Sequence, residues 1–201
     1  MPGQFKNTGT NPGGKVSLIN SNNAGGLQFN APGVGPTTST TTSTTTLATY
    51  TIGQAALGGI IAYINGGGST GTSGLVVTAN DLGPAEWGCN GTNLPGATGT
   101  AIGTGYQNTL DIVANCATAG IAARLCIDLV EGGYSDWYLP SKDELAQLYI
   151  NRVAIGGIGD NYYWSSSETA ANFAYDLDFV YGTIQTTLKT DEDYVRAFRS
   201  F

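Results

Sequence analysis

Ten consecutive hydroxyl side chains, at residues 37–46, constrain this chain more than any other feature of its sequence. Eight of them are threonines, and β-branching restricts the χ1 angle and disfavours helix. A run without one apolar side chain also has nothing to bury in a core. We therefore expect an extended, unmodified spacer over residues 37–49, which separates an N-terminal arm, residues 1–36, from a domain over residues 50–201.

The arm contains two short runs with β character. Residues 15–20 and 27–30 are separated by the turn-forming cluster at residues 21–26, which is the pattern of a hairpin. A hairpin with so few apolar side chains is marginal in water, because burial does not offset the cost of ordering the backbone. We expect the arm to order by docking on a larger assembly. The alternatives are a disordered tail and a strand packed on its own domain.

Charge is distributed unevenly and excludes several classes of partner. Residues 1–49 hold two lysines, whereas residues 50–201 hold all 15 acidic residues and six basic ones, a net charge of -9. Such acidity argues against a nucleic-acid partner, since phosphate binding needs clustered lysine and arginine. No apolar run approaches the roughly 20 residues of a membrane span, so we expect no membrane insertion. The N-terminus also lacks the apolar core of a signal peptide, so we expect no export by the Sec pathway.

The remaining sequence predicts an α+β domain in which helices precede an antiparallel sheet. Residues 59–64 and 74–78 have strand character, and residues 108–130 predict a helix in two pieces broken near Gly120. The next helix begins after Ser141, which forms a capping box with Glu144. Strand-like runs then follow at residues 162–167, 173–179, 182–188 and 194–199.

A search for catalytic chemistry finds neither a nucleophile nor a metal site. The chain has no histidine, so it lacks every catalytic or zinc-binding arrangement that uses one. The serines at residues 165–167 are not in a Gly-x-Ser-x-Gly elbow. The three cysteines have no CxxC spacing. Cys89 and Cys116 could form a disulfide in an oxidising compartment, but the odd number of cysteines and the missing signal peptide favour reduced thiols. Cys126 falls in a helical pattern and is expected to be buried.

Binding is therefore the default interpretation, and the segment from residue 173 to residue 193 is its best candidate. Tyrosines alternate there with small polar and acidic side chains, a composition typical of adaptable binding surfaces. Asp176 and Asp178 share one face of the predicted strand. A hard cation is one interpretation of these acids, but we expect a solvated acidic face, with no metal and no cofactor. The candidate ligand-binding residues are Tyr175, Asp176, Asp178, Tyr181, Thr183, Gln185, Thr187, Asp191 and Asp193.

Three motifs, at residues 132–145, 163–168 and 194–199, resemble the Lcl C-terminal domain family (DUF1566), and the likeness extends over residues 58–201. The resemblance implies a C-type-lectin-like fold, which is related to that of the formylglycine-generating enzymes. Those enzymes use cysteines late in the domain. This chain has none after Cys126, so their activity does not carry over. The calcium-binding signatures of C-type lectins are absent as well.

Large and charged side chains in these motifs have simpler structural interpretations. Trp137 and Trp164 lie beside glycine or serine and are expected to pack in the core. Arg196 and Arg199 fall on opposite faces of one predicted strand. We expect them to form ion pairs with carboxylates such as Asp136 or Glu144.

Together these features predict a non-enzymatic structural protein of a bacteriophage particle, on the capsid or a tail fibre. The arm would attach to other virion proteins, and the lectin-like head would bind a glycan or protein on the bacterial surface. A homo-oligomer is expected, with a trimer favoured because fibres are usually trimeric. A bacterial cell-surface adhesin of the same family is the alternative. An enzyme on a fold like that of the formylglycine-generating enzymes is the third possibility.

Overall fold

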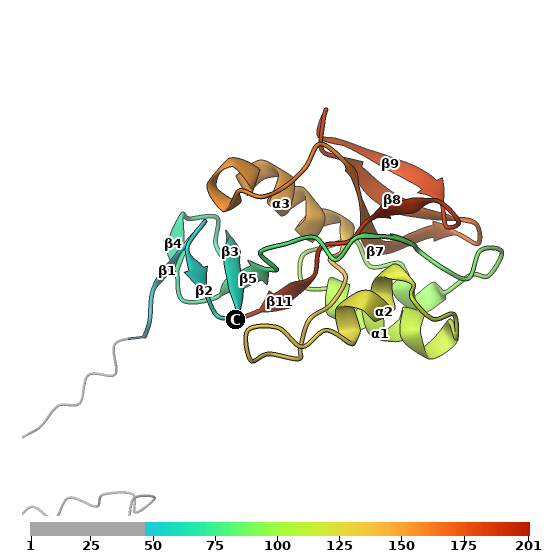
Figure 1. Ribbon diagram of the computed structural model, residues 1–201, viewed down its shortest axis with the longest axis horizontal. Coiled ribbons are helices and arrows are strands. Elements are labelled where there is room, and N and C mark those ends of the chain that lie inside the picture. The colour runs from blue at the N-terminus through green and yellow to red at the C-terminus, as the bar shows by residue number, and fades with distance from the viewer. Residues whose placement is uncertain (1–46) are drawn as a thin grey trace, which may run out of the picture. The chain divides into compact units, whose positions relative to one another are not determined.

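The computed structural model describes residues 47–201 (Figure 1). The arm and the hydroxyl run lie outside the described residues, so the anchor, the hairpin and the spacer stay predictions. The first half contains β1 (Tyr50–Thr51), β2 (Ala55–Ala56), β3 (Gly59–Ile64), β4 (Thr70–Gly71), β5 (Gly74–Val77), β6 (Pro84–Glu86), a 3-10 helix (Pro95–Ala97) and α1 (Gly105–Asn115). The second half contains α2 (Ala122–Ile127), α3 (Lys142–Ile155), β7 (Tyr162–Ala170), β8 (Phe173–Asp178), β9 (Thr183–Leu188), β10 (Glu192–Tyr194) and β11 (Phe198–Ser200).

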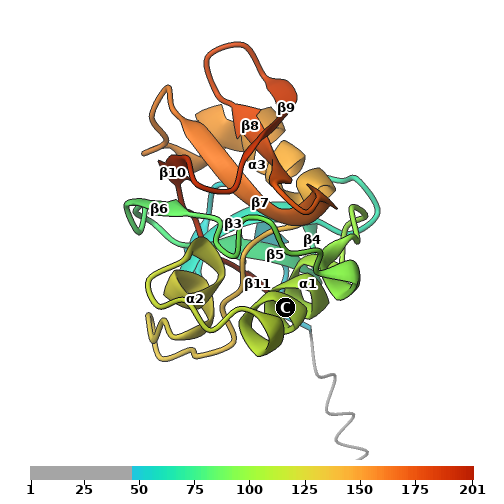
Figure 2. The same ribbon diagram turned by 90° about the vertical axis from the view of Figure 1, so that its right-hand side faces the viewer.

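The strands of residues 47–201 form two larger sheets and one two-stranded ribbon, β1–β4. One larger sheet has the order β6-β10-β7-β8-β9, and the other has the order β11-β5-β3-β2. Figure 2 shows the first sheet in the upper half of the molecule, with α1 and α2 below it. The expectation of an antiparallel sheet is nearly right, but β10 pairs in parallel with β7. The predicted α+β class is confirmed, with mixed rather than purely antiparallel pairing.

The prediction of one strand over residues 194–199 is wrong, because the structure has two short strands there, β10 and β11. The chain leaves the first sheet after β10 and enters the second at β11, so Arg196 lies between the two strands. The Arg196 guanidinium is fully buried and donates to the carbonyl oxygens of Thr78, Ala79 and Gly157, at 2.9, 2.6 and 2.8 Å. It also pairs with Asp81 at 2.9 Å. A strand ladder cannot supply these partners, so the pairing breaks at this point.

Of the two carboxylates named as partners for these arginines, Asp136 forms an ion pair and Glu144 does not. Arg199 donates to both carboxylate oxygens of Asp136, at 2.7 and 3.0 Å, which confirms one of the two named partners. Glu144 pairs with neither arginine. It is buried and accepts from the backbone N–H groups of Ser141 and Gly103, both at 2.8 Å. Desolvation by burial raises the pKa of Glu144, while these hydrogen bonds oppose that shift.

The helices follow the sequence pattern closely. The predicted break near Gly120 is confirmed, since α1 ends at Asn115 and α2 begins at Ala122. The capping box at the start of α3 is also confirmed, because the Ser141 hydroxyl accepts from the N–H of Glu144 and the Glu144 carboxylate accepts in return. No helix within residues 47–201 is long and apolar enough to cross a membrane.

Tryptophan side chains fill the centre of the domain. Trp87, Trp137 and Trp164 are all fully buried, which confirms the core role expected for the last two. The indole N–H of Trp164 donates to the carbonyl of Ala85, and that of Trp87 donates to the carbonyl of Ser165, both at 2.8 Å. These indole hydrogen bonds link the end of β6 to β7 across the sheet, and burial leaves no tryptophan of the described part available to a ligand.

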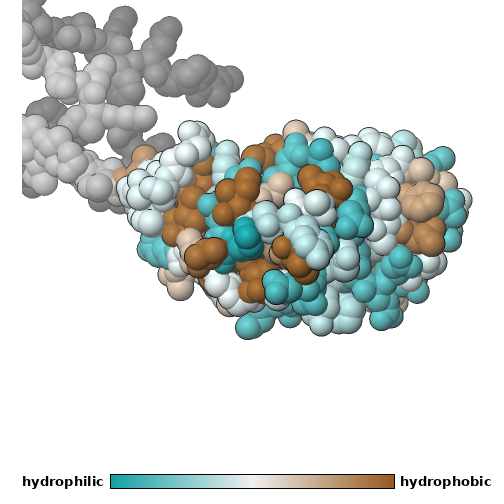
Figure 3. All heavy atoms as spheres, turned by 90° about the horizontal axis from the view of Figure 1, so that it is seen from above, coloured by the Kyte–Doolittle hydropathy of each residue, from teal (hydrophilic) through white to brown (hydrophobic). Residues whose placement is uncertain are grey.

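A second cluster of apolar side chains lies between α3 and the two larger sheets. It includes Leu145 and Leu148 from the helix and Leu177 from β8. The outer side of α3 is not fully polar, since Ile150 and Val153 are 64% and 90% exposed. Figure 3 shows hydrophobic areas on this side of the molecule, interrupted by polar side chains.

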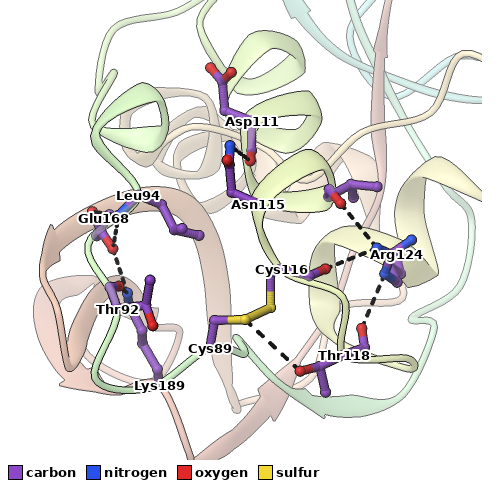
Figure 4. Close-up of a disulfide and its surroundings, with 11 residues drawn as sticks. Cys89, Thr92, Leu94, Asp111, Asn115, Cys116, Thr118, Arg124, Glu168 and Lys189 are labelled. Carbon is purple, nitrogen blue, oxygen red and sulfur yellow. Dashed lines mark hydrogen bonds and ion pairs between the residues drawn. A yellow bond between two sulfur atoms is a disulfide. The ribbon is translucent and has the colours of Figure 1, made fainter.

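Cys89 and Cys116 form a disulfide, which corrects the expectation of reduced thiols (Figure 4). The bond joins the loop after β6 to the end of α1 across 27 positions of sequence. Arg124 lies beside it and donates to the carbonyls of Val113, Cys116 and Thr118. The sequence analysis named this pair as possible, but counting cysteines could not show that it forms, because pairing depends on how the loop and the helix end meet. Cys126 is free and buried as expected, and burial raises the pKa of its thiol.

A buried ion pair between Lys189 and Glu168 fixes the same loop from the other side. The Glu168 carboxylate also accepts from the N–H of Leu94. The Lys189 ammonium donates to the carbonyl of Thr92 at 2.9 Å and lies 4.5 Å from the centre of the Trp87 ring. Each charge therefore has several partners, which is the condition under which burying an ion pair is tolerable.

Breaking this pair should destabilise the protein strongly. Glu168→Gln leaves the Lys189 ammonium buried without its counter-charge, and we expect the free energy of unfolding to fall by about 3–5 kcal/mol. Urea denaturation of the full chain measures the change. Asp143→Asn is the matched control, because it removes the partly exposed Lys142–Asp143 pair and should cost within about 1 kcal/mol. Equal effects of the two substitutions would contradict the prediction.

Candidate functional site

The pairing of β8 with β9 determines which of the candidate ligand-binding residues share a face. Successive side chains of a strand point to opposite faces, so Asp176 and Asp178 lie on one face of the sheet and Tyr175 on the other. Gln185 is opposite Asp176, and Thr183 is opposite Asp178. The acids of β8 and the polar side chains of β9 therefore line the same face.

A hollow of about 240 Å³ opens on this face. It gathers five of the nine candidate residues and adds one that the sequence analysis did not name. The lining side chains are Tyr162, Asp176, Gln185, Thr187, Asp191 and Asp193. They come from β7, β8, β9 and the segment that leads through β10, so residues far apart in the sequence meet in one site.

Four candidate residues do not line the hollow. Tyr175 is half-buried on the opposite face, where the Lys142 ammonium lies 5.5 Å from the centre of its ring. Tyr181 is 78% exposed in the turn between β8 and β9. Thr183 is exposed on the same face as the hollow, outside its lining. Asp178 is buried, and its carboxylate accepts hydrogen bonds within the same turn.

Asp178 builds the turn that positions β9. Its carboxylate accepts from the N–H groups of Val180 and Tyr181, at 2.7 and 3.3 Å. The N–H of Gly182 then donates to the carbonyl of Asp178 at 2.8 Å. Gly182 has φ +72°, and a Cβ there would lie 2.3 Å from the Tyr149 ring, so only glycine fits this position. Asp178 therefore stabilises the turn that positions β9, and β9 forms one wall of the hollow.

The two central acids of the hollow have unsatisfied oxygens. Asp176 is 1% exposed, and neither of its carboxylate oxygens has a hydrogen-bond partner. Asp193 is 9% exposed, and its Oδ2 also lacks one. Buried polar atoms in proteins are almost always paired, because an unpaired one has lost its water without compensation. These acids correct the expectation of a solvated acidic face.

Desolvation and mutual repulsion act on both carboxyls. Burial raises the pKa of Asp176, and the nearby Thr187 hydroxyl opposes the shift without reaching hydrogen-bond geometry. Burial, and then the charges of Asp176 and Asp191, raise the pKa of Asp193 to about 7. Both carboxyls therefore keep their protons to a higher pH than solvated acids do, because the protein itself does not stabilise their negative charge.

Sequence reasoning missed Tyr162, which is 45% exposed and pairs across the ladder with Asp178. The negative charge of Asp178 raises the pKa of the Tyr162 phenol. Alternation along β7 offered a signal, because Tyr162 and the buried Trp164 lie two residues apart and share a face. Only the pairing of β7 with β8 shows that this face belongs to the hollow.

The chemistry available at the site is hydrogen bonding, in which the unpaired carboxylate oxygens are acceptors. Within residues 47–201, no three or more cysteine, aspartate or glutamate side chains converge closely enough to hold a metal ion. A second hollow of about 280 Å³ lies between β6, β10 and the loop before α2, with Glu86 and Glu192 in its lining. No buried unpaired oxygen lies in that lining, in contrast to the hollow around Asp176.

Fold and site together define an α+β domain with an acidic hollow on one sheet face. The chain belongs to the family of the Lcl C-terminal domain, whose family model matches residues 78–199. A crystal structure of a fimbrial protein from Bacteroides ovatus ATCC 8483 is similar over 64% of this chain and 36% of that chain, with 17% identity and a TM-score of 0.41. A likeness at that level does not define the fold. Comparison with curated proteins gives no match.

The raised pKa of Asp193 predicts that this residue destabilises the folded protein as pH rises. An acid whose pKa is about 7 when folded and near 3.8 when unfolded keeps its proton longer in the folded state. Stability therefore falls between about pH 4 and pH 7. Asp193→Asn removes this loss, so its stability relative to the wild type should rise by on the order of 2 kcal/mol from about pH 5 to about pH 8.

Thermal or urea unfolding of both proteins at the two pH values measures this difference. Asp128→Asn is the control, because Asp128 is exposed and lies outside the hollow. A parallel loss of stability in wild type and Asp193→Asn would show that Asp193 is not the titrating group.

Proposed function

We propose that this chain is a non-enzymatic surface protein and that its head recognises a ligand on a bacterial surface through the hollow around Asp176. The observation that supports this function is the pair of buried, unpaired carboxylates at the hollow. Groups of this kind lower the stability of the free protein, and proteins keep such features at functional sites. A ligand that donates hydrogen bonds would satisfy them.

The construction of the site favours recognition over catalysis. Its side chains stand on paired strands, and the Asp178 turn fixes the edge strand β9. Sites on strands are held more precisely than sites on loops, so little ordering entropy is lost on binding. The lining offers carboxylates, an amide, a hydroxyl and a phenol, with no thiol and no histidine. Such a set suits hydrogen bonding to a glycan or to a protein side chain.

We propose that the protein is attached to a bacteriophage particle. In this scheme, residues 1–36 attach to other virion proteins, residues 37–49 hold the head away from the particle, and the head has a C-type-lectin-like fold. The resemblance of the motifs at residues 132–145, 163–168 and 194–199 supports the fold. The hydroxyl run supports the spacer, because β-branched residues favour extended chain. A homo-oligomer, with a trimer favoured, would multiply weak contacts with a cell surface.

The Cys89–Cys116 disulfide favours a second candidate, a bacterial cell-surface adhesin. Disulfides persist in oxidising compartments and are rare in the cytosol. An exported adhesin would form this bond on its way to the surface. A virion protein would form it only after release from the cell. Both candidates share the same exposed location and the same recognition site.

Loss of the Asp176 charge should abolish recognition without unfolding the head. We expect Asp176→Asn to reduce binding of the full chain to susceptible bacterial cells by at least about tenfold, the effect of losing one good polar contact. Binding of fluorescently labelled protein to a panel of bacterial strains measures it. Circular dichroism and the melting temperature check that the variant is folded. Asp128→Asn should bind like the wild type. Undiminished binding by Asp176→Asn would contradict the role of the hollow.

We expect residues 1–36 to determine which particle or surface the protein attaches to. Deleting residues 1–46 is expected to remove the chain from purified phage particles, while the purified head keeps its melting temperature and its cell binding. Mass spectrometry of particles purified from a lysate measures incorporation. If the full chain is missing from the particles and is found in the bacterial outer surface fraction, the adhesin replaces the virion protein as the function.

A further inference from the structure

We propose that the hollow formed by Tyr162, Asp176, Gln185, Thr187, Asp191 and Asp193 binds a protonated primary amine, such as the ammonium group of an amino sugar or of a lysine side chain. This inference rests on the proposed function, because it names the class of ligand that the same site would take. Its basis is charge, geometry and the state of the acids that line the hollow.

No cationic side chain of residues 47–201 compensates the acids of the hollow. Six lysines and arginines fall in this part of the chain, none lines the hollow, and each has its contacts elsewhere. Lys189 pairs with Glu168, Arg196 with Asp81, Arg199 with Asp136 and Lys142 with Asp143. Arg124 and Arg152 donate to backbone carbonyls. The positive charge that would complement the hollow must therefore come from outside this part of the protein.

The arrangement of acceptors suits a small cation with several donors. An ammonium group offers three N–H donors and no acceptor. Both oxygens of Asp176 and Oδ2 of Asp193 are free to accept, and Asp191 adds a third carboxylate to the lining. Charge-assisted hydrogen bonds of this kind are about twice as strong as neutral ones. A volume of about 240 Å³ admits an ammonium group with part of its carbon skeleton.

Aromatic and amide groups add contacts beyond the charge. Tyr162 is the aromatic member of the lining, and aromatic rings attract cations. The Gln185 amide and the Thr187 hydroxyl can both donate and accept, so they suit the hydroxyl groups that an amino sugar carries. The three acids supply the discrimination, because a neutral analogue would leave the buried carboxylates without a counter-charge.

An amine fits these residues better than a divalent cation or a neutral polyol does. Calcium takes six to eight oxygens at about 2.3–2.6 Å, and the carboxylates of residues 47–201 do not converge to that degree. A neutral polyol can donate to Asp176 and Asp193 but leaves their repulsion in place. A monovalent ammonium removes the repulsion and tolerates carboxylates spread over the walls of the hollow.

The test compares ethanolamine, which is protonated near neutral pH, with ethylene glycol, its neutral analogue. We expect ethanolamine to cause saturable chemical-shift changes at the backbone amides of Gln185, Thr187 and Asp193 in the ¹⁵N-labelled full chain. Ethylene glycol should bind at least about tenfold more weakly, the effect of one lost charge interaction. Asp176→Asn and Asp193→Asn should each weaken ethanolamine binding by a similar factor, and Asp128→Asn should leave it unchanged.

Three outcomes would overturn the inference. If ethylene glycol binds as well as ethanolamine, the hollow is a polyol site. If calcium chloride binds there in preference to ethanolamine, the hollow is a metal site. If no probe causes chemical-shift changes, the hollow does not bind small cations. The cell-binding assay separates these failures from failure of the proposed function. If Asp176→Asn still abolishes cell binding, recognition through the hollow stands and only the amine class is wrong.

Discussion

The buried guanidinium of Arg196 is the interaction on which the rest of the domain depends. It lies where the chain passes from one sheet to the other, and its donors reach three carbonyl oxygens and the carboxylate of Asp81. A buried charge is tolerable only when its donors are all engaged, so these partners determine where β10 must end. Asp193 stands three residues earlier on β10. The position of the hollow therefore follows from the packing of a residue that does not touch it.

Several acids of residues 47–201 have a charged or backbone partner, in contrast to the two central acids of the hollow. Glu168, Asp81 and Asp136 each face a lysine or an arginine, and Glu144 accepts from the backbone at the start of α3. Asp176 and Asp193 have neither kind of partner. The other buried acids of this part of the chain, Glu144, Glu168 and Asp178, all have hydrogen-bond partners, so these two are exceptional. Buried polar groups without partners are expected mainly at functional sites, so these two acids mark the best candidate site.

Sequence reasoning predicted what depends on neighbours along the chain and missed what depends on pairing across it. The capping box at Ser141, the break near Gly120 and the burial of Trp164 all follow from local pattern. Five lining residues were also within reach, since they cluster between residues 176 and 193. Tyr162 required the ladder between β7 and β8.

Three further features depend on such contacts, and of these only the disulfide was anticipated, as a possible pair that was expected to stay reduced. The disulfide required the loop after β6 to meet the end of α1. The Lys189–Glu168 pair required β9 and β7 to end at the same loop. The separation of β10 from β11 required the carbonyl cage around Arg196. Pattern along a chain does not encode contacts between segments that are distant in sequence.

The place of β9 at the edge of its sheet has a consequence for how this protein evolves. Five of its side chains are exposed, namely Thr183, Ile184, Gln185, Thr186 and Leu188. Replacing them leaves the tryptophan core and the Arg196 cage undisturbed. Asp176 sits one strand further in and is held by the ladders on both sides. If the hollow binds a ligand as proposed, the charge that attracts it and the side chains that select it lie on different strands. In the proposed function, substitutions on this edge strand would change which ligand is selected, while the scaffold that holds Asp176 stays intact.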